Sequence, residues 1–550
     1  MEEKLSQKAD KLTEEAVKFF VEVMCKTYRK TFEEADLSER LVRIFRQQLG
    51  LSTYSCERKK NVVVYKNGTG KYAQADFPVI LQSHMDMVCV SNHAKPGVTT
   101  KDVFSEGIEL YYADKEKTKM RGRSVKYPDT LTSLGADDGI GVAAIYAILA
   151  NQDIAHPPLI AILTTEEEDG MGGASTLTLD EIKKVIPDSA PLLHFGKAKF
   201  INIDDERDGI FSISCAGTLR GSIVLPIVRG PTHPEGLVYY TLSVSGLQGG
   251  HSGLQIQEGR ANANILLCDV LLRLTYTDID LSFFMLGKCG EASNAIPSQA
   301  SATIAVSADK AKLFEFRLSL IEDFLKDKYY STDPRLELKL SPTQGNPSIK
   351  PYSAGTLASL LFLVRALPDA ALMWDKSKEE SLIQIDGHFQ ITEQFEEEEL
   401  LVETSSNLGL MEEKGETVVL TCMLRSSIDA MKTCVMKDME MLSRIYGATF
   451  KLESSSPGWA YKKDNSLRDL FLKTYNALFA GEGQEAKAVA THAALECGYF
   501  AQKLGDIEMI ACGPKLTDVH SIQETLYINT VPKLMKLLTV VLEEAGETQN

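Results

Sequence analysis

The stretch Phe77-Pro-Val-Ile-Leu-Gln-Ser-His-Met-Asp86 decides how the rest of the chain is interpreted. Its apolar run predicts a buried strand that ends at His84, and residues two apart on a strand point to the same side. Asp86 can therefore accept the spare ring N–H of His84, an arrangement that fixes a metal-bound imidazole in one tautomer. An isolated His-x-Asp triplet more often marks an ordinary strand end, so the interpretation depends on what else the chain brings to it.

The composition indicates a large, acidic protein. The chain has 550 residues, 44% of them hydrophobic, and a formal net charge of -17. Single cores rarely exceed about 250–300 residues, so we expect more than one domain. The negative charge argues against nucleic acid and anionic membrane surfaces as partners. The first ten residues are charged and show no apolar segment of a secretory signal, no run reaches about 18 apolar residues, and the 10 cysteines form no Cys-x-x-Cys pair; we therefore expect a cytoplasmic protein with reduced thiols.

Other predicted strands also end in acidic or histidine side chains. The strands cover 159–163, 200–203 and 507–511. The side chains that follow them are Glu167 and Glu168, Asp204, and His520. A glycine-rich turn before an apolar helix adds Asp137, which alone would suit a helix N-cap. Ligands of open α/β sheets bind at the carboxyl ends of strands, so this set predicts a site for a pair of zinc-like ions.

With these motifs the chain resembles the M20 metallopeptidases, and within them the aminoacyl-histidine dipeptidase (Xaa-His dipeptidase) branch. The resemblance rests on motifs that follow the family's order between residues 77 and 525. They are HMD at 84–86, LGADDGIG at 134–141, EEDGM at 167–171, NID at 202–204, GGHSG at 249–253, GRANAN at 259–264, NAIP at 294–297, HAALECG at 492–498, and GP with HS between 513 and 521. The implied fold is α/β, a mixed-sheet di-zinc peptidase catalytic domain with an inserted α/β lid domain.

The resemblance implies a role for each residue of the predicted metal site. Asp137 would bridge two divalent ions, expected to be Zn²⁺, with Co²⁺ or Mn²⁺ as alternatives. His84 and Asp204 would complete one ion's site, and Glu168 and His520 the other's. Asp86 would orient His84, and Glu167 would act as the general base. Because Glu166 directly precedes this pair, a slip of register by one residue would exchange the base and the ligand.

The resemblance also implies a set of substrate-binding residues. His251 resembles the lid histidine that stabilises the oxyanion in this family. Arg425 and Asn294 are candidates for binding the substrate carboxylate, although Arg425 on a strand equally suits a structural ion pair. His492 and Glu496 are four residues apart, which predicts one face of a helix. Glu496 would hold the substrate amino end or support the metal site.

The order of the motifs predicts the domain organisation and the function. Residues 1–215 and 457–550 would form the catalytic domain, and 216–456 an inserted lid and dimerisation domain. The expected activity is hydrolysis of unblocked dipeptides, Xaa-His dipeptides such as β-alanyl-histidine and a broader range beside them, by a homodimer. The alternatives are another M20 activity (aminoacylase, tripeptidase or carboxypeptidase) and a catalytically silent metal-binding scaffold.

Two parts of the chain depart from the family pattern. Asp138 stands where asparagine is common, which adds a negative charge near the metal ligands. The first 60 residues match the family poorly and leave one wall of the substrate pocket undefined.

The local patterns predict helices over 8–25, 37–49 and 465–480, and a hairpin insertion over 91–130.

Overall fold

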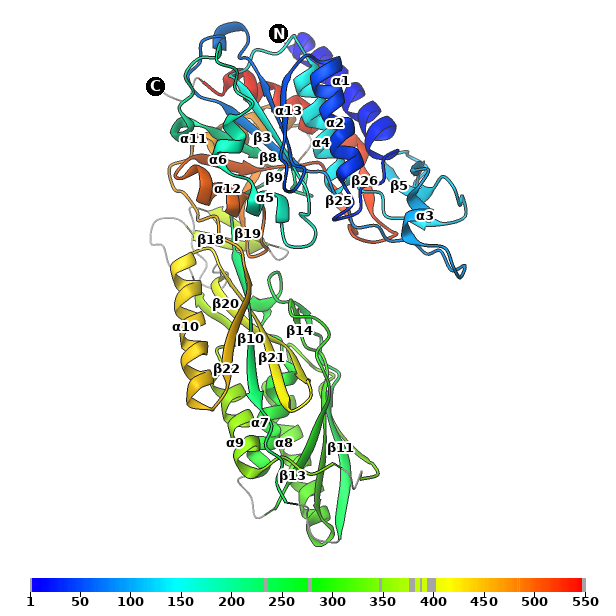
Figure 1. Cartoon of the computed structure of the whole chain (residues 1–550), viewed down its shortest axis with the longest axis vertical. Helices are drawn as coiled ribbons and strands as arrows, with labels where there is room; N and C mark the ends of the chain where they lie inside the picture. Colours follow the sequence, from blue (N-terminus) through cyan, green and yellow to red (C-terminus); the bar gives the residue numbers. More distant parts are fainter. Residues whose placement is uncertain are drawn as a thin grey trace. The chain divides into compact units, whose positions relative to one another are not determined.

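The computed structural model describes residues 2–231, 236–275, 279–345, 349–374, 381–385, 388–392, 402–481, 483 and 485–546. These form two compact units, which are described separately below (Figure 1). Unit 1 contains Met1–Ser214, Tyr461–Ala490 and Glu496–Asn550, and unit 2 contains Cys215–Ala460 and Thr491–Leu495. The domains expected from the sequence divide the chain after 215 and 456, whereas the units divide it after 214 and 460 and assign 491–495 to unit 2.

Unit 1 is built on a mixed sheet with the strand order β1-β2-β7-β3-β8-β24-β9-β23. The strands are β1 (Ser52–Ser55), β2 (Val62–Lys66), β3 (Val79–His84), β7 (Leu159–Thr164), β8 (Lys199–Asn202), β9 (Ile210–Cys215), β23 (Lys487–Thr491) and β24 (Glu508–Ala511). The predicted apolar strands are confirmed, and β3, β7 and β8 are buried along their whole length. Because β3, β7, β8 and β24 run parallel, their carboxyl ends share one edge of the sheet.

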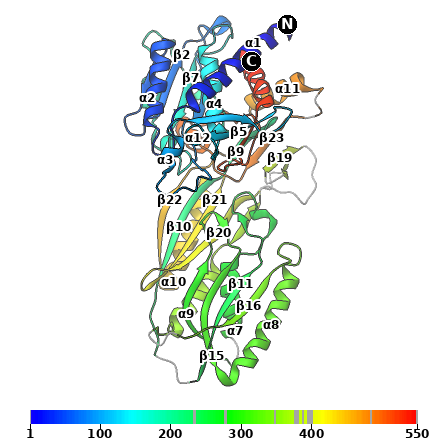
Figure 2. The same ribbon diagram turned by 90° about the vertical axis from the view of Figure 1, so that its right-hand side faces the viewer.

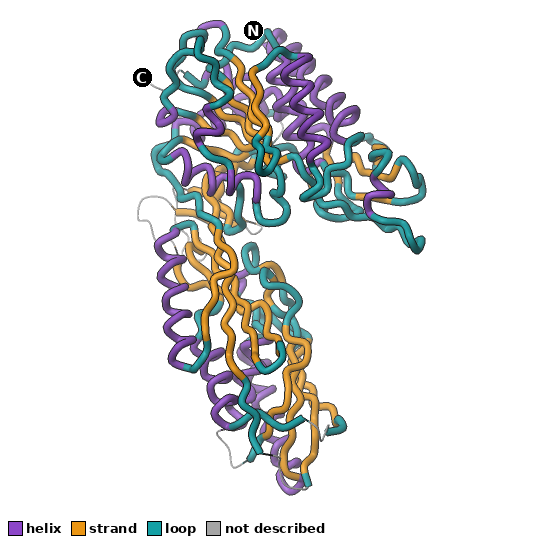
Figure 3. Tube along the Cα trace, in the orientation of Figure 1, coloured by secondary structure: helices purple, strands orange, loops and turns teal. Residues whose placement is uncertain are grey.

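Helices flank the sheet of unit 1, as the purple and orange segments of Figure 3 show. They are α1 (Glu2–Phe19), α2 (Ala35–Arg43), α4 (Ala136–Ala150), α5 (Gly172–Thr176), α6 (Leu179–Lys183), α11 (Ser466–Phe479), α12 (Cys497–Leu504) and α13 (Val531–Glu544). The small, apolar α4 packs on β3, and α1 packs on both α4 and α13. The two ends of the chain are therefore neighbours within unit 1, where Lys8 Nζ lies 2.7 Å from Glu543 Oε1.

The remaining predictions for unit 1 are confirmed with shifted ends. The expected helices over 8–25 and 37–49 each begin as an α-helix and end as a π-helical turn, at Phe20–Met24 and Ile44–Gln48. The expected hairpin insertion contains α3 (Thr100–Phe104) and the antiparallel pair β4 (Ile108–Tyr112) and β5 (Lys119–Ser124). This pair belongs to a small sheet completed by β6 (Leu131–Thr132), β25 (Leu516–Thr517) and β26 (Thr525–Tyr527).

Unit 2 contains two larger antiparallel sheets with helices packed on them (Figure 2). The first sheet is β17 (Ala370–Trp374), β20 (Val402–Glu413), β21 (Thr417–Ser426), β10 (Gly217–Pro226) and β22 (Thr449–Ser455), and α10 (Asp429–Ile445) packs on it. The second is β13 (Ser282–Cys289), β15 (Ala300–Ser307), β11 (Leu237–Ser245) and β16 (Glu337–Pro342). Strands β18 (Ser381–Ile385) and β19 (His388–Thr392) pair with each other antiparallel.

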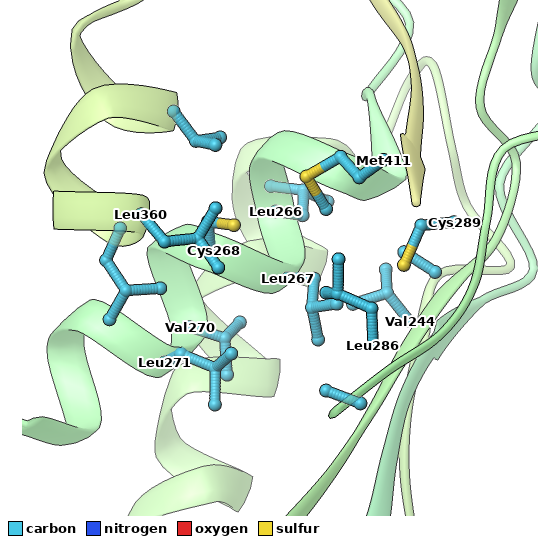
Figure 4. Close-up of a cluster of buried hydrophobic side chains, with 14 of the residues drawn as sticks. Val244, Leu266, Leu267, Cys268, Val270, Leu271, Leu286, Cys289, Leu360 and Met411 are labelled. Carbon is cyan, nitrogen blue, oxygen red and sulfur yellow. The ribbon is translucent and has the colours of Figure 1, made fainter. Parts of the chain in front are cut away.

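The core of unit 2 lies between its helices and its strands. The helices are α7 (Ala263–Thr275), α8 (Ala311–Lys328) and α9 (Ala354–Ala366). Figure 4 shows α7 side chains such as Leu267 and Leu271 pointing into a cluster with Leu360, Val244 and Leu286. A short ladder at the edge of this core joins β12 (Gly250–His251) to β14 (Ala295–Ile296), which brings two predicted substrate-binding segments together. Among the helices the structure describes, none is long and apolar enough to span a membrane.

Candidate metal centre

The predicted metal ligands of unit 1 converge at the carboxyl edge of its sheet. His84 ends β3, Glu168 follows β7 and Asp204 follows β8. One oxygen of Asp137 lies 3.0 Å from His84 Nε2, and the other lies 3.0 Å from His520 Nε2. His84 Nε2 is also 3.6 Å from Asp204 Oδ1, and His520 Nε2 is 2.7 Å from Glu168 Oε2. A single carboxylate therefore joins two histidine–carboxylate pairs.

Asp86 organises the groups around His84. Its Oδ1 lies 3.4 Å from His84 Nδ1, the ring nitrogen that faces away from Asp137. The same carboxylate accepts hydrogen bonds from the backbone N–H groups of Glu167, at 3.0 Å, and Glu168, at 3.3 Å. Asp86 thus orients the imidazole from behind and fixes the loop that carries the glutamates, which is how partners of metal ligands act in known sites.

The three consecutive glutamates have different surroundings. Glu166 Oε2 lies 2.5 Å from Lys59 Nζ, away from the histidines, and the Glu166 N–H donates to Glu34 Oε1 at 3.0 Å. Glu168 faces His520, while Glu168 Oε1 is buried and has no hydrogen-bond partner among the described residues. These contacts favour the register in which Glu168 is the ligand and Glu167 the base.

The charges of the cluster shift the pKa values of its members strongly. Burial disfavours a charged imidazole, but the carboxylates of Asp204, Asp137 and Asp86 raise the pKa of His84 well above its ordinary value. Hydrogen bonds to Asp137 and Glu168 raise the pKa of His520 to about 11. Burial raises the pKa of Asp204 to about 6 and that of Glu167 well above its ordinary value. The carboxylates of the cluster lie close together and outnumber its histidines. Divalent cations would relieve the resulting excess of negative charge.

Asp138, the departure from the family pattern, is held by its own neighbours. Its Oδ2 accepts from the Ser83 hydroxyl and from the His84 N–H at 3.2 Å, and its Oδ1 accepts from the Gly141 N–H at 3.2 Å. The side chain is buried, and burial beside Asp204 raises its pKa well above the ordinary value. The extra carboxylate therefore ties β3 to the start of α4 rather than facing solvent.

The donor set fits divalent metal ions. Two overlapping groups of side chains, which share His84, place ligand atoms close enough to hold an ion: His84 with Asp138 and Asp204, or His84 with Asp137 and Glu168. Zinc–ligand bonds of about 2.0–2.2 Å at tetrahedral angles put two ligand atoms roughly 3.3 Å apart. The nitrogen–oxygen separations around Asp137 run from 2.7 to 3.6 Å and bracket that distance. Imidazole and carboxylate ligands suit zinc, cobalt and manganese.

Two residues next to this centre were missed by the sequence analysis. Arg29 is 0% exposed and donates to the carbonyl oxygens of Met85 and Asp86, at 2.9 Å each, and of Gly135. Glu524 is 2% exposed and accepts from the backbone N–H groups that precede and include Asp137. Since the partners of both side chains are backbone atoms, no spacing in the sequence could have revealed them.

Unit 2 contains three of the four predicted substrate-binding residues, together with His492, and both His251 and His492 contact Arg425 of β21. Arg425 is 5% exposed, its Nη2 lies 3.4 Å from His251 Nε2, and its Nη1 lies 3.5 Å from the His492 carbonyl oxygen. No carboxylate among the described residues forms an ion pair with Arg425. This speaks against the alternative in which Arg425 belongs to a structural ion pair. Burial lowers its pKa to about 10, which leaves it charged at neutral pH.

His251 ends β12 and Asn294 directly precedes β14, the two strands of the short ladder in unit 2. His251 Nδ1 accepts from the N–H groups of Gly253, at 3.3 Å, and Leu254, at 3.1 Å, which favours the tautomer with its proton on Nε2, although Arg425 Nη2, a donor only, faces that nitrogen. Burial, and after it the charge of Arg425, lower the pKa of His251 to about 4. The Asn294 side chain is exposed, and its carbonyl oxygen accepts from the Ser252 N–H at 2.8 Å.

The predicted helix across His492 and Glu496 is wrong. Helix α12 begins at Cys497, and His492 lies in a bend where Nε2 contacts the Ser405 hydroxyl at 2.8 Å. Glu496 is fully buried in unit 1, where its Oε2 accepts from Gln82, at 2.5 Å, and Thr164, at 2.6 Å. The chain passes from unit 2 to unit 1 between these residues, so a spacing of four did not mean one helical face. The contacts of Glu496 favour support of the ligand-bearing strands over substrate binding.

Comparisons with known proteins identify the family of the chain. Residues 115–544 match peptidase family M20/M25/M40. The chain is 29% identical over 524 residues to the cytosol non-specific dipeptidase of Escherichia coli (strain K12), covering 95% of this chain and 96% of that protein. The crystal structure of aminoacylhistidine dipeptidase from Vibrio alginolyticus matches with a TM-score of 0.78 and 25% identity over 96% of each chain. Aminopeptidase PepT from Bacillus cereus matches in fold, with a TM-score of 0.51 and 13% identity over 97% of this chain and 98% of that one. The chain therefore belongs to peptidase family M20/M25/M40 and is a metallopeptidase.

Proposed function

We propose that the protein is a two-metal dipeptidase that hydrolyses unblocked dipeptides, with Xaa-His dipeptides among its substrates. The observation that carries the proposal is Asp137, whose two oxygens each lie 3.0 Å from a different histidine. A carboxylate shared in this way can hold two cations side by side. The names of the relatives in Escherichia coli and Vibrio alginolyticus support a dipeptide substrate.

Five side chains would hold the two divalent ions, Zn²⁺ in our proposal. They are Asp137 between the ions, His84 and Asp204 on one, and Glu168 and His520 on the other. When bound, the ions would lower the pKa of a water held between them and polarise the scissile carbonyl. Asp86 keeps Nε2 of His84 directed at Asp137 by occupying the far side of the ring.

Glu167 is the residue we assign to proton transfer. It directly precedes the ligand Glu168, and its N–H is fixed by Asp86. Burial raises the pKa of its carboxyl well above the ordinary value, and enzymes tune the carboxyl groups that act as general bases in this direction. Its carboxylate would take the proton from the attacking water and later deliver it to the amine nitrogen of the leaving group.

Residues of unit 2 would recognise the substrate. With its proton on Nε2, His251 is a neutral hydrogen-bond donor suited to a developing oxyanion. Arg425 is a buried guanidinium without a carboxylate among the described residues, which suits the terminal carboxylate of a dipeptide. The exposed side chain of Asn294 would add a second polar contact.

We propose that the active form of the protein is a cytoplasmic homodimer.

Metal analysis together with a substrate panel tests the proposal. The purified protein should contain about two divalent ions per chain. It should hydrolyse carnosine, Gly-His and Ala-Leu, and it should leave tripeptides and N-acetyl amino acids largely intact. Hydrolysis of N-acetyl amino acids without cleavage of any free dipeptide would contradict the dipeptidase assignment, and a protein that binds metal but cleaves none of these compounds would favour a silent scaffold.

A further inference from the structure

The segment that leads into Asp137 is held from both sides by buried charges. On one side, Glu524 accepts hydrogen bonds from four consecutive backbone N–H groups. Their distances are 2.7 Å for Leu134, 3.0 Å for Gly135, 2.8 Å for Ala136 and 3.3 Å for Asp137. These N–H groups precede the regular turns of α4 and would otherwise lack partners, as the first N–H groups of a helix do.

On the other side, Arg29 binds carbonyl oxygens. One guanidinium nitrogen donates to Met85 and Asp86, and the other donates to Gly135. The Arg29 carbonyl oxygen in turn accepts from the Met87 N–H at 3.1 Å. Arg29 therefore connects the segment before Asp137 to the segment after His84, and each of these segments adjoins a predicted ligand.

The arrangement matches the direction of the peptide dipoles. At Gly135 the N–H, which is the positive end, faces the Glu524 carboxylate, and the C=O, which is the negative end, faces the Arg29 guanidinium. Hydrogen bonds to charged groups are roughly twice as strong as neutral ones, and they are strongest where water is excluded. Both side chains are buried, so these hydrogen bonds lie where water is excluded.

We infer that Arg29 and Glu524 are positioning residues that preorganise the metal centre by clamping the Leu134–Asp137 segment. This inference rests on the two-metal site of the proposed function. It also assigns a role to Arg29, which lies in the divergent first 60 residues. A bridging carboxylate must present both oxygens at once, so a small rotation of this segment would spoil both ion sites together.

Zinc titration of the metal-free protein tests the inference without relying on catalysis. We expect Glu524→Gln and Arg29→Met to weaken Zn²⁺ binding by roughly ten- to hundred-fold, the loss typical when partners of metal ligands are removed. Arg29→Lys, which keeps the charge but not the fork of donors, should lose less than Arg29→Met. The visible spectrum of the Co²⁺-loaded variants should change as well, because it reports ligand geometry.

Matched controls separate positioning from general stability. Arg40 lies in the same N-terminal region and binds Thr27 and the Glu22 carbonyl oxygen, away from the ligands. Asp333 in unit 2 is a buried carboxylate that accepts two backbone N–H groups at 2.8 Å each. Arg40→Met and Asp333→Asn should lower the melting temperature and leave Zn²⁺ affinity unchanged.

Two results would overturn the inference. The first is wild-type Zn²⁺ affinity, within about twofold, in Glu524→Gln and both Arg29 variants, with melting temperatures that fall as in the controls. The second is a wild-type protein that binds no Zn²⁺ or Co²⁺ at all, which would also overturn the two-metal function and is therefore distinguishable from the first. Should Arg29→Met fail to fold, Arg29→Lys and the nearly isosteric Glu524→Gln still decide the question.

Discussion

His84 and His520 of unit 1 and His251 and His492 of unit 2 lie in opposite electrostatic environments. His84 and His520 each face carboxylates, and their pKa values are raised. His251 and His492 are buried beside Arg425, and burial together with that positive charge lowers their pKa values to about 4 and about 3. The raised pKa values of the first pair suit histidines that exchange a proton for a metal ion, and the lowered pKa values of the second pair keep those rings neutral at pH 7.

The difference extends to the other charged groups of the two clusters. The cluster in unit 1 contains several carboxylates around two histidines, and an excess of negative charge at short range is relieved by cations. Arg425 in unit 2 is a buried cation for which no carboxylate partner lies among the described residues. One cluster is suited to bind positive ions and the other an anionic end of a small molecule, and an unblocked dipeptide has such an end.

Removal of the metal should have the largest effect and should act through unit 1. Dialysis against a chelator should abolish dipeptide hydrolysis, and readdition of Zn²⁺, Co²⁺ or Mn²⁺ should restore it. The measurement is hydrolysis rate against bound metal per chain. Full activity in a protein shown by elemental analysis to be metal-free would contradict the proposed chemistry.

Substitution of the proposed base should come next. Glu167→Gln should lower kcat by roughly 10²–10⁴-fold, because the amide cannot accept the proton of the attacking water. The metal content should stay at the wild-type level, since Glu167 is not assigned as a ligand. As a register control, Glu166→Gln should keep most of the activity because Glu166 pairs with Lys59; an equal loss in both variants would contradict the assignment.

Substitution of the buried arginine should have a smaller effect that is confined to substrate recognition. Arg425→Met should lower kcat/KM for free dipeptides by roughly ten- to hundred-fold, the value of a lost hydrogen bond to a charged group. Metal content should not change. Dipeptide amides, which lack the carboxylate, should be poor substrates for the wild type and be affected little by the substitution. A loss of metal, or an equal loss for amides and acids, would contradict the assigned role.

The sequence could predict the centre where strands deliver the ligands. Apolar runs ending at His84, before Glu168 and at Asp204 are a local signal, and parallel pairing then brings their ends to one edge. The parts that could not be predicted depend on contacts with the backbone. Arg29 and Glu524 bind carbonyl and N–H groups, which every residue has, so their partners leave no trace in the pattern of side chains.

His492 and Glu496 do not share a helix although they are four residues apart, because their motif does not stay within one element. The chain crosses from one unit to the other between them, and only Glu496 reaches the strands under the metal ligands. Periodicity describes a segment once its secondary structure is known, but the place where a chain leaves one core for another is decided by tertiary packing. For the same reason, no pattern in the sequence predicted that residues 491–495 belong to unit 2.

The smallest effect we predict is the titration of these histidines, which tests the comparison itself. In metal-free protein at pH 7, His84 and His520 should be protonated, and His251 and His492 neutral. The stability contributed by His520 should be fully present below its unfolded pKa of about 6.5 and be lost as pH rises through about 11. The stability contributed by His251 and His492 should be present above about pH 6.5 and be lost as pH falls through about 4 and 3.

Nuclear magnetic resonance of histidine-labelled protein can follow the titration of these four rings, since the chain has only 9 histidines. Added Zn²⁺ should convert the two protonated rings to neutral ligands and release protons, while the signals of His251 and His492 should keep their neutral form. Binding of Zn²⁺ without proton release would show that the two clusters do not differ as their charges indicate.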